Sequence, residues 1–374
     1  MVIPLDSKQV SKEWLNSVIN VKEVKEVIGH VNEGGVLSSI FKAKIIDNDG
    51  QERKLFIKIM PNPDQDQRIL IEGFGLDKRE VKTYVKLFKE LEDFEETQLG
   101  VKNIQSIICD FWAADCSDVK EKRGFYIILD DVSQDFKMPD LDKGMTKDQI
   151  IDALEKLAYF HSLTYCYRNM KNSIDYLIDY PMVYQDFLDS KNTREFFDSL
   201  FKKAILQLKE THRDDLAKIL EKLSKNYVEK FKMAFGGTDG RFLTHGDMWS
   251  NNIMFDKNGK CILVDWQFTC ASTPYLDIAS MAFMNQNPEE MESNSNTFLQ
   301  AYFNKFNKIC AKFKVGGPWH DFKGFSTEAT HQGFLSLFAW LMLSFDPCVY
   351  TRRIFDRFVY IFEKALNFHP EFFA

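Results

Sequence analysis

The stretch His245-Gly246-Asp247-Met248-Trp249-Ser250-Asn251-Asn252, followed thirteen residues later by Asp265-Trp266-Gln267, decides the fold of this 374-residue chain. It has the form H-x-D-x-x-x-x-N, and after it an apolar stretch ends in a single Asp. Phosphoryl transfer needs one acid beside the attacking hydroxyl, and an Asn and a second acid that hold Mg²⁺ against the nucleotide phosphates. The motif therefore predicts Asp247 as the catalytic acid-base group and Asn252 and Asp265 as metal ligands.

The sequence around the motif predicts a β-hairpin. Apolar residues 253–255 and 261–264 flank Asp256-Lys257-Asn258-Gly259, and Asn and Gly tolerate the positive φ angles of a tight turn. In the alternative interpretation the two acids belong to turns, Asn252 is a cap and His245 is a core histidine. Agreement between the motif and its predicted context favours the catalytic interpretation.

Composition excludes several classes of protein. A net charge of −7 without a basic stripe argues against nucleic-acid binding. The seven cysteines are scattered and form no CxxC pair, so neither a zinc site nor a disulfide framework is indicated. The N-terminus lacks the pattern of a signal segment, and the longest apolar run, 334–345, is too short to cross a bilayer. We therefore expect a cytoplasmic protein without membrane insertion; its oligomeric state is not indicated.

The order of predicted elements indicates an α+β, bilobal fold with a small antiparallel-sheet N-lobe and a large, mainly helical C-lobe. We expect the nucleotide-binding lobe at residues 1–132 and the helical lobe, with the catalytic loop and the acceptor pocket, at 133–374. Predicted strands are 24–31, 36–46, 54–59, 107–112 and 125–129. Predicted helices are 11–19, 67–91, 147–165, 194–209, 216–231, 289–310, 322–345 and 353–368.

A lysine on a strand and an acid on the following helix complete a phosphate-positioning pair. Lys58 lies between apolar residues in a predicted strand, although it could equally project from a solvated strand face. Glu80 is the preferred partner on the charged helix that follows, and Glu72 is its competitor.

Two further segments are candidates for nucleotide contact. Backbone amides of the turn containing Gly34 and Gly35, with the hydroxyl of Ser38, can approach phosphate oxygens, although the turn lacks a G-x-G-x-x-G pattern. At the crossing between lobes, the main chain from Asp130 to Val132 could hydrogen-bond an adenine edge.

Three more residues have structural and functional interpretations. Asp277 opens an apolar helix, where it could favour the helix dipole, brace the catalytic loop, or do both. His161 lies on an apolar helix and is interpreted as a core histidine outside the site. Trp249 is expected to pack or to border the acceptor pocket.

The block 245–252, then 265–267, then Pro274–Asp277, resembles the ecdysteroid-kinase-like family, which belongs to the clan of choline kinases and aminoglycoside phosphotransferases with protein-kinase-like folds. The resemblance extends from about Gly29 to Phe368. It implies ATP-dependent phosphorylation of a small-molecule hydroxyl, with ATP and Mg²⁺ as cofactors. Asp247 would be the base, Asn252 and Asp265 the metal ligands, and His245 a brace of the catalytic loop.

Departures from the family pattern narrow the expected class of phosphate acceptor. Family members commonly carry Phe where this chain has Trp266, which is a mild change. Choline kinases usually carry Asn in place of Gly246 and Glu in place of Gln267, which argues against choline as the acceptor. An aromatic-rich helical lobe favours an apolar alcohol, such as an ecdysteroid-like steroid. Kinases for an amino alcohol, a sugar or a xenobiotic hydroxyl, and a non-catalytic binding protein, remain alternatives.

Overall fold

The computed structural model describes residues 3–4, 7–29, 38–61, 66–117, 119, 123–171, 174–181, 191–235, 240–344 and 351–374. The chain divides into two compact units. The first combines Met1–Lys137 with Ile262–Thr269, and the second combines Met138–Cys261 with Cys270–Ala374. The fold is of the mixed α+β class that the sequence predicts, with an antiparallel five-stranded sheet in the first unit and a mainly helical second unit.

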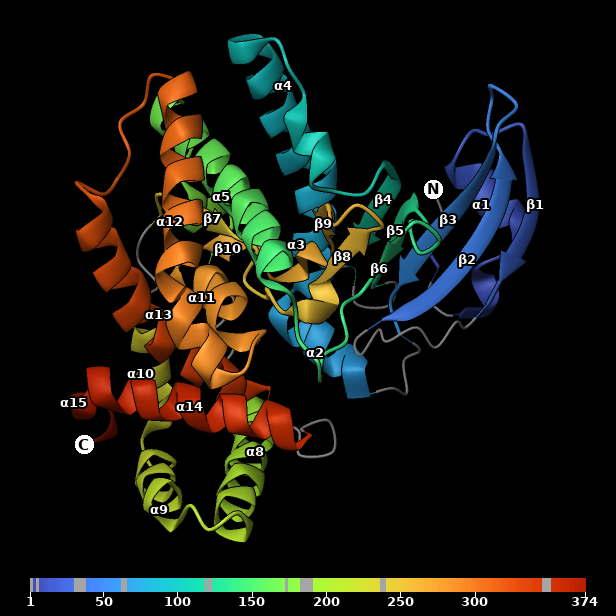
Figure 1. Ribbon diagram of the computed structural model, residues 1–374. Helices are drawn as coiled ribbons and strands as arrows, with labels where there is room; N and C mark the ends of the chain where they lie inside the picture. The colour runs from blue at the N-terminus through green and yellow to red at the C-terminus, as the bar shows by residue number, and fades with distance from the viewer. Residues whose placement is uncertain are drawn as a thin grey trace. The chain divides into compact units, whose positions relative to one another are not determined.

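The sheet of the first unit has the strand order β1-β2-β3-β5-β4, and all of its pairs are antiparallel (Figure 1). Its strands are β1 (Glu23–Ile28), β2 (Ser39–Ile46), β3 (Glu52–Ile59), β4 (Phe111–Ser117) and β5 (Gly124–Asp130). Alternate residues of β2 are buried, as expected for a strand with one face on a core. Helix α1 (Lys12–Val18) packs on that core with Trp14 and Leu15, and Ser11 caps it by accepting from the Trp14 N–H.

The sequence predicted one continuous helix over 67–91, and this prediction was wrong because the helix is interrupted. The structure has α2 (Asp66–Phe74), α3 (Leu76–Lys82), a π-helical turn η2 (Thr83–Leu87) and α4 (Phe88–Leu99). Gly75 separates the first two with φ +62°, a left-handed conformation that glycine adopts without the steric cost of a Cβ. The predicted strand 107–112 is also displaced: 3₁₀ helix η3 (Asn103–Ser106) precedes it and β4 begins at Phe111.

The second unit is built from helices. They are α5 (Lys147–Met170), α6 (Tyr176–Asp179), α8 (Lys191–Glu210), α9 (Asp214–Leu223), α10 (Tyr227–Ala234), α11 (Tyr275–Met284), α12 (Pro288–Lys312), α13 (Phe322–Leu343), α14 (Arg352–Phe368) and α15 (Pro370–Phe373). Thr146 and Gln149 form a capping box at the start of α5. The predicted helix 216–231 is two helices, because the chain turns at Ser224–Asn226. No helix in the described part of the chain is long and apolar enough to cross a membrane.

Short strands carry the H-x-D-x-x-x-x-N motif of residues 245–252 and Asp265. They are β7 (Leu243–Thr244), β8 (Ile253–Asp256), β9 (Cys261–Leu263) and β10 (Cys270–Ala271), with 3₁₀ turns η5 (Ser250–Asn252) and η6 (Trp266–Phe268) between them, and the two-residue β6 (Phe136–Lys137) lies earlier in the chain. The predicted hairpin is confirmed: Gly259 N–H donates to Asp256 O at 3.0 Å, and Gly259 has φ +79°. Pairing of β7 with β10 was not predicted.

Candidate active site

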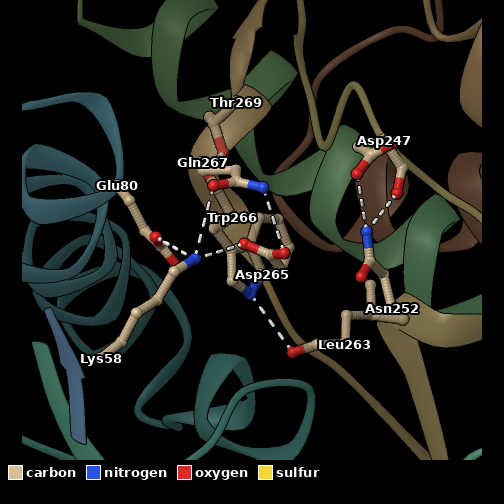
Figure 2. Close-up of polar contacts among 9 residues, drawn as sticks. All are labelled: Lys58, Glu80, Asp247, Asn252, Leu263, Asp265, Trp266, Gln267 and Thr269. Atoms are coloured by element: carbon tan, nitrogen blue, oxygen red, sulfur yellow. Dashed lines mark hydrogen bonds and ion pairs between the residues drawn. The ribbon is translucent and has the colours of Figure 1, made fainter. Parts of the chain in front are cut away.

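Lys58 lies at the centre of a polar cluster in the first unit. The side chain projects from β3 and is only 8% exposed. Its Nζ lies 2.6 Å from Glu80 Oε2 and 2.7 Å from Asp265 Oδ1 (Figure 2). The structure thus pairs Lys58 with Glu80, whereas Glu72, the competing acid, pairs with Arg68 at 2.8 Å.

Two carboxylates share one ammonium in this cluster, so its formal charge is −1. Burial raises the pKa of Glu80, and the negative charge of Asp265 raises it further, to about 7. Lys58 lowers this pKa but only partly offsets the other two effects. Burial alone would lower the pKa of Lys58, but Asp265 and Glu80 outweigh it and hold that pKa above its ordinary value. Lys58 therefore stays charged, and the cluster favours an additional cation or proton.

Gln267 connects the two ends of this cluster. Its Nε2 donates to Asp265 Oδ2 at 3.2 Å, and its Oε1 accepts from Lys58 Nζ at 3.4 Å. An amide can donate to the carboxylate and accept from the ammonium at once, which an ionised carboxylate at this position could not do. From the sequence, Gln267 was notable only as a departure from choline kinases. The signal that could have indicated its role in the cluster is its position, because it is a polar residue two positions after Asp265.

The segment that carries Asp265 is fixed by helix α3 and by its own turns. Asp265 has φ +64°, and Trp266, which follows it, is fully buried and packs edge-to-face on Phe88 with the ring centroids 5.0 Å apart. Arg79 donates to Thr269 O at 2.8 Å, and Trp266 Nε1 donates to Leu263 O at 3.2 Å. These contacts hold Asp265 in place independently of Lys58.

Asp247 and Asn252 meet in the second unit. Asn252 Nδ2 donates to the main-chain oxygen of Asp247 at 2.7 Å and to Asp247 Oδ2 at 2.9 Å (Figure 2). The amide nitrogen is therefore used inside the loop, and Oδ1 is the atom of Asn252 suited to a metal. Asp247 is half-buried and Trp249 is also partly exposed, so both can face a ligand.

Asp277 holds the main chain immediately before Asp247. Its Oδ2 accepts from the His245 N–H at 2.7 Å, and its Oδ1 accepts from the Gly246 N–H at 3.0 Å. Gly246 has φ +80°, which a residue with a Cβ rarely adopts. Of the two interpretations of Asp277, the brace of the catalytic loop thus has direct contacts in the structure.

The other predicted nucleotide contacts are placed as follows. Gly34 and Gly35 lie outside the described residues. Ser38 Oγ is buried and has no hydrogen-bond partner within the described residues. The Asp130 N–H donates to Asp110 O, and the Asp130 side chain accepts from Trp112 Nε1 at 2.6 Å, so both are already used. Val132 O accepts from two N–H groups of the following turn. In the described part of the chain the Val132 N–H has no acceptor, so it is the donor left for a ligand.

The donor set fits Mg²⁺. A carboxylate and an amide oxygen are hard ligands, and Mg²⁺ is usually held by one or two such groups together with phosphate oxygens and water. In the described ranges no three His, Cys, Asp or Glu side chains gather as a metal cluster. Asp265 in the first unit and Asn252 in the second unit each carry an oxygen of this kind.

Comparison with known proteins gives a family and a set of related folds. The model of the ecdysteroid kinase-like family matches residues 34–315. Solved structures with a similar fold include the ADP-bound aminoglycoside phosphotransferase APH(2'')-Ib, at 14% identity and a TM-score of 0.40, with 95% of this chain and 97% of that chain covered.

Two further solved structures were matched. They are the AMP-bound spectinomycin phosphotransferase APH(9)-Ia, at 12% identity and a TM-score of 0.46, with 97% of this chain and 99% of that chain covered, and the choline kinase LicA from Streptococcus pneumoniae, at 13% and 0.42, with 96% and 99% covered. No curated protein matches the chain by sequence.

Proposed function

Because the chain belongs to the ecdysteroid kinase-like family, we propose that it is a small-molecule kinase that transfers the γ-phosphate of ATP to a hydroxyl group. The observation that carries the proposal is the pair of preformed clusters. Lys58, Glu80 and Asp265 form one, and Asp247 with Asn252 forms the other. A kinase needs both, because one positions phosphate and metal and the other receives the proton of the acceptor.

The proposed reaction assigns a role to each side chain. The acceptor oxygen bonds to the γ-phosphorus while the bond from that phosphorus to the bridging oxygen breaks, and ADP leaves. Asp247 takes the hydroxyl proton and later releases it to water. Lys58, oriented by Glu80, contacts the phosphate oxygens. When bound by Asp265 and Asn252, Mg²⁺ would neutralise charge on the phosphates.

We further propose that the acceptor is an apolar alcohol, such as an ecdysteroid-like steroid. The helical unit is dense in aromatic side chains, and Trp249 is partly exposed two residues after Asp247. Amino alcohols, sugars and xenobiotic hydroxyls are the competing acceptors. Mass spectrometry of products from a panel of these four classes, incubated with MgATP, distinguishes them by which compound gains one phosphoryl group.

The catalytic assignment is tested with Asp247→Asn, using Asp93→Asn on the exposed face of α4 as the charge-matched control. Loss of a positioned acid-base group should lower kcat by about 10²-fold or more while MgADP affinity, measured by calorimetry, stays within about twofold. Asp265→Ala should instead abolish the Mg²⁺-dependent part of nucleotide binding. Full turnover in Asp247→Asn would refute the assignment, and phosphorylation of no acceptor by the wild type would favour the non-catalytic alternative.

A further inference from the structure

A buried chain of side chains extends from helix α12 to the catalytic loop. Tyr302 on α12, His161 on α5 and Asp277 on α11 are all 0% exposed. The Tyr302 hydroxyl lies 2.9 Å from His161 Nδ1, and His161 Nε2 lies 3.1 Å from Asp277 Oδ2. All three lie in the second unit, where α5 and α12 run side by side (Figure 1).

Hydrogen-bonding chemistry fixes the direction of this chain. A carboxylate only accepts, so His161 Nε2 must carry the proton that is donated to Asp277. Nδ1 of the neutral imidazole then accepts, and Tyr302 donates its hydroxyl proton to it. An imidazolium would donate from Nδ1 and leave the Tyr302 proton without an acceptor, because that hydroxyl makes no other hydrogen bond among the described residues. The contacts therefore select one neutral tautomer of His161.

Asp277 passes this orientation to the catalytic loop. Its Oδ2 receives both His161 Nε2 and the His245 N–H, and its Oδ1 receives the Gly246 N–H. The His161 imidazole is the side-chain donor to this carboxylate. Without it, a fully buried carboxylate would lose one of three donors and its fixed orientation, and the loop amides would lose a defined acceptor.

We infer that His161, oriented by Tyr302, is a positioning residue for Asp247. The inference rests on the proposed kinase function, because it assigns His161 an effect on turnover. A histidine that only fills the core would affect stability and leave the rate of the folded enzyme unchanged. The array ends at Gly246, the residue immediately before the proposed base, and small misplacement of a reacting group can cost about 10²-fold in rate.

Three substitutions and one control test the inference. His161→Leu removes both hydrogen bonds, Tyr302→Phe removes only the donor to Nδ1, and His161→Gln keeps one donor and one acceptor. Leu163→Ala is the control, because Leu163 is also 0% exposed on α5 and its apolar side chain donates no hydrogen bond to Asp277, so its truncation destabilises the core and leaves that array in place. All rates are measured well below the unfolding temperature of the weakest variant.

We expect kcat to fall by about 10- to 100-fold in His161→Leu and by about 3- to 10-fold in Tyr302→Phe, with KM for ATP within about twofold. His161→Gln should recover most of the loss, and Leu163→Ala should keep the wild-type kcat. A folded His161→Leu variant with wild-type kcat would overturn the inference, and so would an equal fall of kcat in Leu163→Ala.

Hydrogen exchange separates this inference from the proposed function. In His161→Leu the amides of His245 and Gly246 should exchange at least about 10-fold faster relative to those of α14, and in Leu163→Ala the ratio should not change. If the wild type phosphorylates no acceptor, the proposed function fails, yet faster exchange would still support the bracing. Unchanged exchange would refute the bracing in either case.

Discussion

Replacement of Lys58 by Met removes the cation that two buried carboxylates share. Glu80 is 2% exposed and lies 2.6 Å from Nζ, and Asp265 lies 2.7 Å from it. Removing one member of a buried ion pair costs about 3–5 kcal/mol of folding free energy. Two features place this case at the lower end: the Asp265 side chain is 31% exposed, and the pKa of Glu80, about 7, lets it take a proton at neutral pH. We therefore expect Lys58→Met to lower the free energy of unfolding by about 3 kcal/mol.

The double-mutant cycle with Glu80→Gln gives the sharper measurement. Glu80→Gln alone should cost about 1 kcal/mol, because Lys58 keeps Asp265 and gains an amide acceptor. The double variant replaces the pair by neutral groups of similar volume and should cost about 1–2 kcal/mol. The two substitutions should therefore couple by about 2–3 kcal/mol.

Urea unfolding without nucleotide, followed by the fluorescence of the six tryptophans, measures each corner of the cycle. Lys54→Met on the same strand is the control, because Lys54 makes no ion pair among the described residues, and it should change stability by less than about 0.5 kcal/mol. Additivity of Lys58→Met and Glu80→Gln to within about 0.5 kcal/mol would refute the shared-ammonium cluster.

Three other substitutions have defined outcomes. Gln267→Glu adds a carboxylate that cannot donate to Asp265 Oδ2, so it should destabilise the free protein by about 1–3 kcal/mol. Mg²⁺ should raise the unfolding midpoint of this variant more than that of Gln267→Leu, and equal Mg²⁺ responses would contradict the reasoning. Trp266→Phe loses a hydrogen bond to Leu263 O and ring volume in the core, so unfolding in urea should show a loss of about 1–3 kcal/mol, and a neutral change would argue against that packing. Gly144→Ala should lower the free energy of unfolding by at least about 2 kcal/mol, because φ is +79° and a Cβ would lie 2.2 Å from Asn285 O. Gly73→Ala, with open space around it in α2, is the control and should be neutral or stabilising. Similar effects at both sites would refute the steric reason.

The sequence predicted the elements whose signal is local. The hairpin follows from Asp256–Gly259, and the long helices follow from the periodicity of their apolar residues. The break at Gly75 could not be read in the same way, because a single glycine is tolerated inside many helices and only packing decides where it ends one.

Long-range pairing explains the other differences. Glu72 and Glu80 lie on one charged stretch, and the structure separates them through Arg68, which takes the first, and Lys58, which takes the second. His161 was interpreted from the sequence as a core histidine outside the site, and its contacts could not be predicted because its partners Asp277 and Tyr302 lie 116 and 141 residues further along the chain. In each case the sequence identified the residue as a candidate for a structural or functional role, whereas its partner depends on the tertiary fold.

The left-handed backbone of Asp265 bears on how such an enzyme could lose its chemistry. Holding a side chain other than glycine at φ +64° costs about 1 kcal/mol, with aspartate and asparagine among the residues that bear it best. Asp265→Gly or Asp265→Asn would therefore remove the carboxylate while relieving or preserving that backbone. A lineage carrying either substitution would keep a well-folded protein, and natural selection against misfolding would not remove it. One nucleotide change at this codon is enough for Gly or Asn, so under the proposed function a single step here would remove the carboxylate assigned to the metal.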